Sequence, residues 1–169
     1  MPITVRRIRP DEARTLKRTR LALLADSPSA FGSTLARELA FPDEVWAERA
    51  TGSSAGVHRA TFLAFDGDTV VGIVGALRAS VASDTIELVS MWIAPAARRS
   101  GLGRLLVDTV LAWAGDAGAR SIELWVTRGN DAALHLYEST GFAVTGDHQP
   151  LPSDPCRDEI RMRRALDGR

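Results

Sequence analysis

The chain has 169 residues, a length that predicts a single domain spanning residues 1–169. It carries 21 Lys and Arg residues against 21 Asp and Glu residues, so it lacks the basic excess that usually accompanies nucleic-acid binding. The single cysteine, Cys156, excludes an intrachain disulfide, and its proline-rich surroundings show no pattern for a catalytic thiol. We therefore expect a globular protein with no nucleic-acid partner.

The start of the chain, Met-Pro-Ile-Thr-Val-Arg, lacks a basic head followed by a long apolar run, so it does not resemble a signal peptide. No apolar stretch approaches the roughly 18 residues that a membrane span needs. Together these features predict a cytoplasmic protein without a membrane partner.

The first third of the chain predicts one short strand and small helices. Apolar and polar residues alternate over 3–8, which is typical of a strand. A proline followed by acidic residues opens a helix over 10–26, and the same signal opens another over 42–50. Residues 29–38 read as a loop or a broken helix, and 51–56 as a flexible turn.

The pattern then changes to strands alternating with helices. An Asp-Gly turn between two apolar runs predicts a β-hairpin of strands 60–65 and 69–77. Apolar residues at helical spacing predict a helix over 101–115. The other expected elements are strands over 85–93 and 121–126, a helix over 130–139, a strand beginning at 142–144, a loop over 148–157 and a last strand over 158–166. The fold class is therefore α/β (α+β), a mixed sheet with helices on both faces.

The most informative segment joins the strand 85–93 to the helix 101–115. It is rich in arginine, and two glycines, Gly101 and Gly103, open the helix. Free backbone amides at a helix start, together with the helix dipole, form an anion site that glycine lets a ligand approach closely. Arg98, Arg99 and Arg104 add positive charge. The residues alone thus predict a bound phosphate or other anion.

The type of phosphate ligand is not fixed by these residues. A dinucleotide fingerprint needs a third glycine where this chain has Leu106, and a P-loop needs a Gly-Lys-Ser/Thr run that is absent. Both nucleotide alternatives are thereby disfavoured.

Two spaced motifs carry a family resemblance. Arg98-x-x-Gly101-x-Gly103 resembles the Gln/Arg-x-x-Gly-x-Gly/Ala signature of the GNAT superfamily of N-acetyltransferases. Asn130 to Phe142 is similar to the second motif of that family, an Asn, Ala, Leu-Tyr and Gly-Phe run, and the last strand also fits. The resemblance implies a single-domain, mostly antiparallel twisted sheet with a parallel, splayed strand pair at its centre.

The same resemblance implies acetyl-CoA as co-substrate. Backbone amides from Gly101 to Arg104 and the neighbouring arginines would hold the pyrophosphate, and pantetheine would pair with the edge of the third strand, which carries a bulge in this family. A backbone amide there would polarise the thioester carbonyl. The implied cofactor-binding residues are Met91, Trp92, Ile93, Arg98, Arg99, Ser100, Gly101, Leu102, Gly103, Arg104, Asn130 and Ala133.

Catalysis of amine acylation requires proton transfer, because an alkylammonium with a pKa near ~10 cannot attack before it is deprotonated. Glu87 matches the position of the glutamate base in histone-type members, and Tyr137 matches the usual general acid. Alternatively, Glu87 is only an outward residue of a strand. No histidine has partners at metal-ligand spacing, so no metal is expected. Phe31 and Trp46 could line the acceptor site, although we favour the core.

The predicted function is an N-acetyltransferase that acts on a primary amine by direct attack in a ternary complex. The alternatives are a CoA-binding module without catalysis, another acyl donor, or a hydroxyl or thiol acceptor. The acceptor itself cannot be read from the sequence, and a homodimer rests on the resemblance alone.

Overall fold

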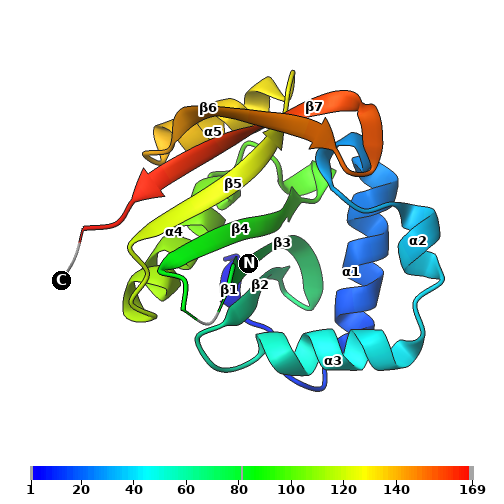
Figure 1. Cartoon of the computed structure of the whole chain (residues 1–169). Helices are drawn as coiled ribbons and strands as arrows, with labels where there is room; N and C mark the ends of the chain where they lie inside the picture. The colour runs from blue at the N-terminus through cyan, green and yellow to red at the C-terminus, as the bar shows by residue number, and fades with distance from the viewer. Residues whose placement is uncertain (1, 81, 168–169) are drawn as a thin grey trace.

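The strands of the protein form one mixed sheet. In the computed structural model, which describes residues 2–80 and 82–167, seven strands are hydrogen-bonded in the order β1-β2-β3-β4-β5-β7-β6 (Figure 1). Neighbouring strands are antiparallel except for the central pair β4 and β5, which is parallel. The bounds are β1 Thr4–Arg7, β2 Arg59–Asp66, β3 Thr69–Arg78, β4 Thr85–Ile93, β5 Ser121–Thr127, β6 Ala143–Leu151 and β7 Asp154–Ala165.

Helices cover both faces of this sheet, as the sequence predicts. On one face lie α1 (Ala13–Asp26), α2 (Leu35–Leu39) and α3 (Asp43–Ser53), and on the other lie α4 (Leu102–Asp116) and α5 (Asp131–Ser139) (Figure 1). Two short 3-10 turns, η1 (Pro28–Ala30) and η2 (Pro95–Ala97), follow α1 and β4. Among the helices of the described residues, none combines the length and apolar character that a membrane crossing requires.

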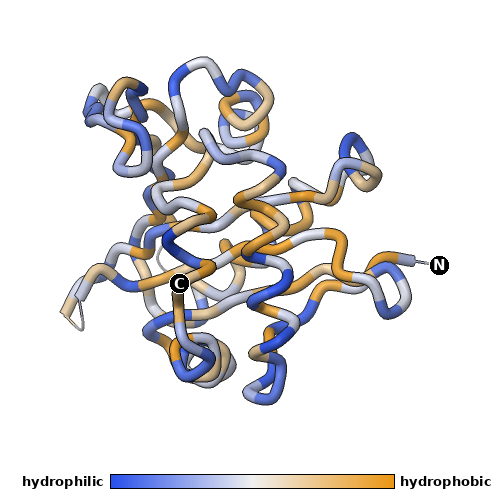
Figure 2. The backbone as a smooth tube through the Cα atoms, turned by 90° about the vertical axis from the view of Figure 1, so that its right-hand side faces the viewer, coloured by the Kyte–Doolittle hydropathy of each residue, from blue (hydrophilic) through white to orange (hydrophobic). Residues whose placement is uncertain are grey.

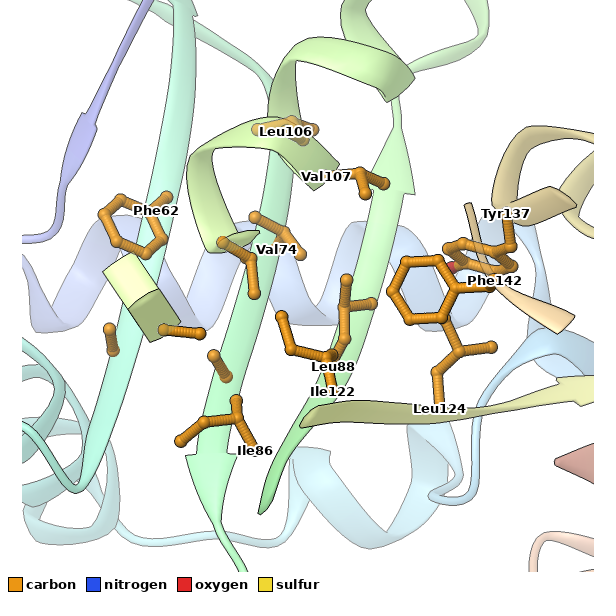
Figure 3. Close-up of a cluster of buried hydrophobic side chains, with 14 of the residues drawn as sticks. Phe62, Val74, Ile86, Leu88, Leu106, Val107, Ile122, Leu124, Tyr137 and Phe142 are labelled. Carbon is orange, nitrogen blue, oxygen red and sulfur yellow. The ribbon is translucent and has the colours of Figure 1, made fainter. Parts of the chain in front are cut away.

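The sheet separates two hydrophobic cores, and hydrophobic segments run through the centre of the molecule (Figure 2). The larger core packs α4 and α5 against the central strands, and Leu106 and Val107 of α4 belong to the same cluster of buried side chains as Ile86 and Leu88 of β4 (Figure 3). Successive side chains of a strand point to opposite faces. Glu87, between Ile86 and Leu88, therefore points to the face that α1, α2 and α3 only partly cover.

The parallel strands β4 and β5 pair over three positions and then separate. Their last paired residues are Glu87 and Glu123. Beyond them β4 carries a bulge, because its register against β3 shifts between Val89 and Trp92 and Ser90 has a φ of 57°. The bulge bends β4 away from β5, and this confirms the splayed central pair.

The expected loop over 148–157 is wrong. There β6 continues to Leu151 and β7 begins at Asp154, so that the two strands form a hairpin with a tight turn. Pro150, Pro152 and Pro155 are typical of a loop, but Pro150 is on β6, an edge strand that tolerates a missing N–H donor, and Pro152 is in the turn. Pro155 is at the shift of register between β6 and β7, where β7 has extra residues. The buried side chain of Leu151 anchors this end of the hairpin.

Candidate active site

The loop before α4 and the first turn of that helix form an anion seat, residues 98–104. Arg99 and Gly101 have φ angles of 59° and 84°, in the left-handed region, and such turns direct successive N–H groups to one side. The amide of Leu105 donates to the carbonyl of Gly101 at 3.2 Å. The amides of residues 102–104 precede this bond and have no intrahelical acceptor, so they and the helix dipole favour an anion.

The three arginines of the seat differ in the hydrogen bonds and ion pairs that they form. Arg98 donates from Nε to the carbonyl of Ile93 at 3.0 Å and forms an ion pair with Asp26. Its guanidinium therefore holds the loop in place. Arg99 is exposed, and Nε of Arg104 lies 3.9 Å from Asp108. Arg99 and Arg104 consequently have the greater freedom to contact a ligand.

A groove of about 620 Å³ runs along this seat; we call it the α4 groove. It lies between the end of β4, α4 and α5, and its volume is in the range of pockets for small ligands. The cofactor residues predicted from the sequence that line it are Met91, Trp92, Ile93, Arg98, Arg99, Gly101, Gly103, Arg104, Asn130 and Ala133.

Two predicted residues are not among the lining of the α4 groove. The hydroxyl of Ser100 donates to the carbonyl of Ala97 at 2.6 Å, and the side chain of Leu102 is buried in the core. Gly103 has a packing role that the sequence did not suggest, because a Cβ there would lie 3.0 Å from the Leu136 side chain. A Cβ at Gly101 would meet nothing within 4 Å, so that position is open to a ligand.

The end of β4 presents a free backbone edge to the α4 groove. On one side Trp92 and Ile93 pair with β3, whereas pairing with β5 has ended at Glu87. Nε1 of Trp92 also donates to Asp26 at 2.9 Å. Asp26, which sequence reasoning missed, thus ties the end of α1 to both β4 and Arg98.

Tyr137 lies in a smaller cavity of about 70 Å³ between β4 and β5, the β4–β5 cavity. It comes from α5, which begins after Asn130, whose Oδ1 accepts from the amide of Ala133 at 3.3 Å. The ring of Tyr137 is 5.9 Å from that of Phe142, and burial raises the pKa of its phenol above the ordinary value. The hydroxyl therefore stays protonated and can donate.

Glu87 lies in a third cavity, the Glu87 cavity, of about 270 Å³. Trp125, Gln149 and Glu159 also line it. Burial raises the pKa of Glu87, as do the charges of Glu159 and Glu123, and Arg161 acts in the opposite direction. A carboxylate whose pKa is raised is a stronger base than an exposed glutamate, so Glu87 is suited to accept a proton.

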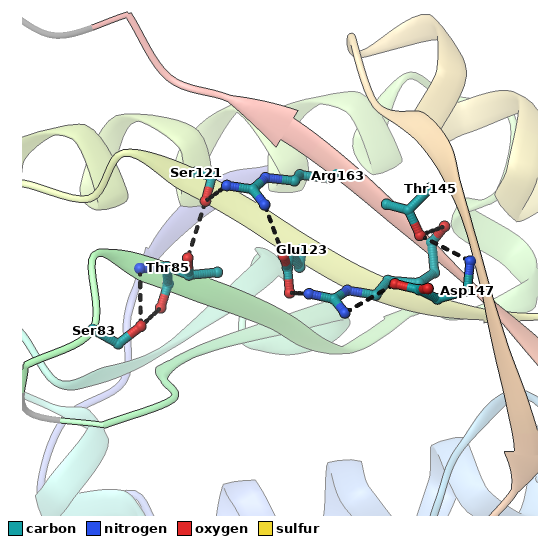
Figure 4. A network of polar contacts seen from close by, with 8 residues as sticks. Ser83, Thr85, Ser121, Glu123, Thr145, Asp147 and Arg163 are labelled. Carbon is teal, nitrogen blue, oxygen red and sulfur yellow. Dashed lines mark hydrogen bonds and ion pairs between the residues drawn. The ribbon is translucent and has the colours of Figure 1, made fainter.

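The neighbouring carboxylates are engaged in different ways. Glu123 is held between Arg161 and Arg163, the latter at 3.5 Å (Figure 4). Glu159 is buried, accepts from Nε2 of Gln149 at 2.7 Å, and has a pKa raised mainly by burial. Glu159 and Gln149 were missed by sequence reasoning, because their place beside Glu87 depends on the pairing of β7 with β5 and β6.

The three cavities adjoin one another. Ala30 and Phe31 line all of them, Met91 lines the α4 groove and the β4–β5 cavity, and Ser90 lines the β4–β5 and Glu87 cavities. Phe31 is buried in the second core, as favoured, yet it also stands at this junction, whereas Trp46 lies in the core beside α1. Among residues 2–80 and 82–167, no group of three or more His, Cys, Asp or Glu side chains could hold a metal ion.

Known proteins resemble the chain at two levels. The sequence model of the acetyltransferase (GNAT) family matches residues 22–142. Streptothricin acetyltransferase from Streptomyces lavendulae is 29% identical over 107 residues, 63% of this chain and 57% of that protein. The chain spans between 26% and 57% of the length of the curated relatives it matches.

Solved structures show the same fold. A GNAT-family acetyltransferase from Streptococcus pneumoniae aligns with a TM-score of 0.82 at 22% identity, over 98% of this chain and 100% of that one. The yncA protein from Salmonella typhimurium, solved with its cofactor acetyl-CoA, aligns with a TM-score of 0.77 at 18% identity, over 100% and 96% of the two chains. The match to the family model covers most of the chain, and the chain belongs to the acetyltransferase (GNAT) family.

Proposed function

We propose that residues 1–169 form one catalytic domain that transfers an acetyl group from acetyl-CoA to a primary amine by direct attack in a ternary complex. The observation that carries the proposal is the meeting of three cavities at the split between β4 and β5. One contains an anion seat, one a protonated phenol, and one a carboxyl with a raised pKa. An acyl donor and an amine can approach each other there from opposite sides of the sheet.

The α4 groove fits acetyl-CoA. The amides of residues 102–104, the left-handed turns at Arg99 and Gly101, and the charge of Arg104 suit a pyrophosphate. The free edge at Met91, Trp92 and Ile93 suits an extended pantetheine that adds to the sheet as a strand would. The binding of acetyl-CoA by yncA supports this assignment. Acetyl-CoA would supply the acetyl group as a thioester.

In this proposal Glu87 accepts the proton of the acceptor ammonium, directly or through a water. Its raised pKa makes the carboxylate a stronger base than an exposed glutamate. Glu159 and Glu87 also give the cavity an acidic character that suits a cationic amine better than a neutral hydroxyl or a thiol. This favours an amine over the alternative acceptors.

Tyr137 donates the proton that the leaving sulfur takes up. Tyr137 lines the β4–β5 cavity, which shares Met91 and Asn130 with the α4 groove. A backbone amide at the free edge of β4 polarises the thioester carbonyl. Glu87 and Tyr137 lie on the two sides of the split. Glu87 would therefore take a proton from the amine and Tyr137 would give one to the sulfur, without the two residues competing for the same proton.

Calorimetry with acetyl-CoA, free CoA, NAD and ATP tests the cofactor assignment, and thiol release with a panel of primary amines tests the reaction. We expect micromolar binding of acetyl-CoA, no binding of NAD or ATP, and CoA release that depends on the amine. Binding without release for any amine would favour a non-catalytic CoA-binding module. Absence of binding by the folded protein would refute the proposal at its first step.

A further inference from the structure

Another cavity, larger than the Glu87 cavity, lies on the same face of the sheet, and its lining is rich in arginine. It has a volume of about 360 Å³ and lies between the helices α1, α2 and α3 and the strands β2, β3 and β4. Its charged residues are four arginines and one glutamate, Arg20, Arg37, Arg49, Arg59 and Glu38. We call it the arginine cavity. It shares Val89 and Ser90 with the Glu87 cavity, so the two adjoin at the bulge of β4.

The one carboxylate of the arginine cavity is already neutralised. Glu38 is buried and accepts two bonds from Arg20, with Nε at 3.1 Å and Nη2 closer. Burial alone would raise the pKa of Glu38, but the hydrogen bonds from Arg20 and Ser33 hold it below the ordinary value. Nη1 of Arg20 donates to the Ser90 hydroxyl at 2.7 Å. Arg20 and Glu38 thus form a closed pair.

Positive charge remains after this pairing. The nearest contact of Arg49 to a carboxylate is 3.9 Å from Glu38, and its Cζ lies 4.9 Å from the ring centroid of Phe41 and 5.4 Å from that of Trp46. Arg37 lies over the Phe41 ring at 5.9 Å and has no carboxylate within 4 Å in the described residues.

Burial lowers the pKa of Arg49, and the charges of Arg20 and Arg37 act in the same direction. Arg59, by contrast, is paired with Glu48 at the rim of the cavity. A half-buried guanidinium that lies over aromatic rings and has no carboxylate of the described residues closer than 3.9 Å is suited to bind a planar anion in a forked geometry. The unmatched charge therefore resides on Arg49 and Arg37.

We propose that the arginine cavity binds a carboxylate of the acceptor whose amine lies beside Glu87. The acceptor class is then a molecule that carries a primary amine and a carboxylate at its two ends. This inference rests on the proposed function, because it needs the amine in the Glu87 cavity. The charges of the two cavities are opposite and the lining is shared at Ser90, so such a molecule is oriented with its amine toward the thioester.

Two matched series of acceptors test this proposal: linear amino carboxylates with a terminal amine, and alkylamines of the same chain lengths. In the wild type we expect kcat/KM for the best amino carboxylate to exceed that of its matched alkylamine about tenfold or more. Arg49→Gln should raise KM for the carboxylate series by roughly 10- to 100-fold with little change in kcat. It should leave the alkylamine series unchanged.

The matched control is Arg18→Gln, on an exposed part of α1 away from the arginine cavity, which should change neither series. If Arg49→Gln fails to fold, Arg37→Gln on the exposed side of α2 provides the same test with a smaller expected effect. Equal kcat/KM for both series in the wild type would overturn the inference. The inference would also be overturned if Arg49→Gln or Arg37→Gln raised KM for the amino carboxylates and the alkylamines by the same factor.

Failure of the proposed function has a different signature. If acetyl-CoA binds but no amine gives thiol release, the transfer reaction is refuted. Calorimetry with hexanoate, a carboxylate without an amine, then tests the cavity by itself. Binding that is lost in Arg49→Gln supports a carboxylate site, and no binding, or binding that Arg49→Gln leaves intact, overturns it.

Discussion

The two sides of β4 differ in how their binding groups are built. On the α4 side, the anion seat consists of the consecutive residues 98–104, and its main donors are backbone amides. On the other side, Glu87, Glu159 and Arg49 come from a central strand, the last long strand and a helix of the first third of the chain. The anion seat is formed by one short segment of the sequence, whereas the groups on the Glu87 side come together only when the chain has folded.

This difference has a functional consequence. A site made of backbone amides keeps its ligand while the surrounding side chains vary, whereas a site made of side chains changes its ligand with each substitution. We therefore expect substitutions on the Glu87 side to alter the acceptor and the rate with little effect on acetyl-CoA affinity. Substitutions at the anion seat should lower acetyl-CoA affinity with little effect on the acceptor and the rate. The following predictions test this separation, beginning with the largest effect.

Tyr137 stands between the two sides, and its replacement should have the largest effect. Tyr137→Phe keeps the edge contact with Phe142 and removes only the hydroxyl. We expect kcat to fall about a hundredfold or more, since general acid catalysis contributes roughly 10²- to 10⁴-fold. The dissociation constant of acetyl-CoA, measured by calorimetry, should stay within about twofold. An unaltered kcat would remove Tyr137 as the acid.

Glu87→Gln should change the pH dependence of the reaction. A raised pKa means that the carboxylate forms at higher pH than an ordinary glutamate does, so the rise of the wild-type rate with pH should be shifted to higher pH as well. In the variant this rise should be absent, and kcat near neutral pH should be about a hundredfold lower.

A companion variant sharpens this prediction. The charge of Glu159 contributes to the raised pKa of Glu87, so Glu159→Gln should move the rise in rate to lower pH without abolishing it. Acetyl-CoA affinity should be the same in both variants. The assignment of Glu87 as the base is untenable if the pH profile of Glu87→Gln matches that of the wild type.

The same contrast explains what could be predicted from the sequence. The α4 helix and the seat were predictable, because the spacing of Gly101 and Gly103 and the apolar face of the helix are local signals. The β6–β7 hairpin was not, since Pro150 looks like a loop residue until β6 is known to be an edge strand. Glu159 could be placed on a strand, but its approach to Glu87 depends on pairings across more than thirty residues.

Reversal of charge at the seat should weaken acetyl-CoA binding and leave the acceptor side unchanged. In Arg99→Glu/Arg104→Glu, two exposed positive charges of the α4 groove become negative. Because solvent screens exposed charges, we expect only a roughly tenfold to hundredfold rise in the dissociation constant, reduced at high salt. The value of kcat at saturating acetyl-CoA should hardly change.

The control for this prediction reverses charge elsewhere. Arg14→Glu/Arg18→Glu makes the same change on an exposed surface of α1 that is outside the α4 groove. Equal loss of acetyl-CoA affinity in both double variants would show a long-range effect of net charge rather than a contact at the seat.

The smallest effect is expected at Asp26, where the two sides are joined. Hydrogen bonds from Trp92 and Ser27, with the Arg98 ion pair, hold the pKa of Asp26 below its ordinary value. Its contribution to stability is therefore present above the ordinary aspartate pKa and is lost as pH falls through the lowered one. Asp26→Ala should lower the free energy of unfolding at neutral pH by about 1 kcal/mol or less, as measured by urea denaturation.

Asp26→Ala should also raise the KM for acetyl-CoA about threefold, because Arg98 loses one of its two anchors and the anion seat becomes less ordered. The KM for the acceptor should rise less. If instead only the acceptor KM changes, Asp26 acts through α1 on the Glu87 side, and its contacts with Trp92 and Arg98 do not support the anion seat. The separation of the two sides would then hold at Asp26 as well, although its contacts join α1 to Trp92 and Arg98.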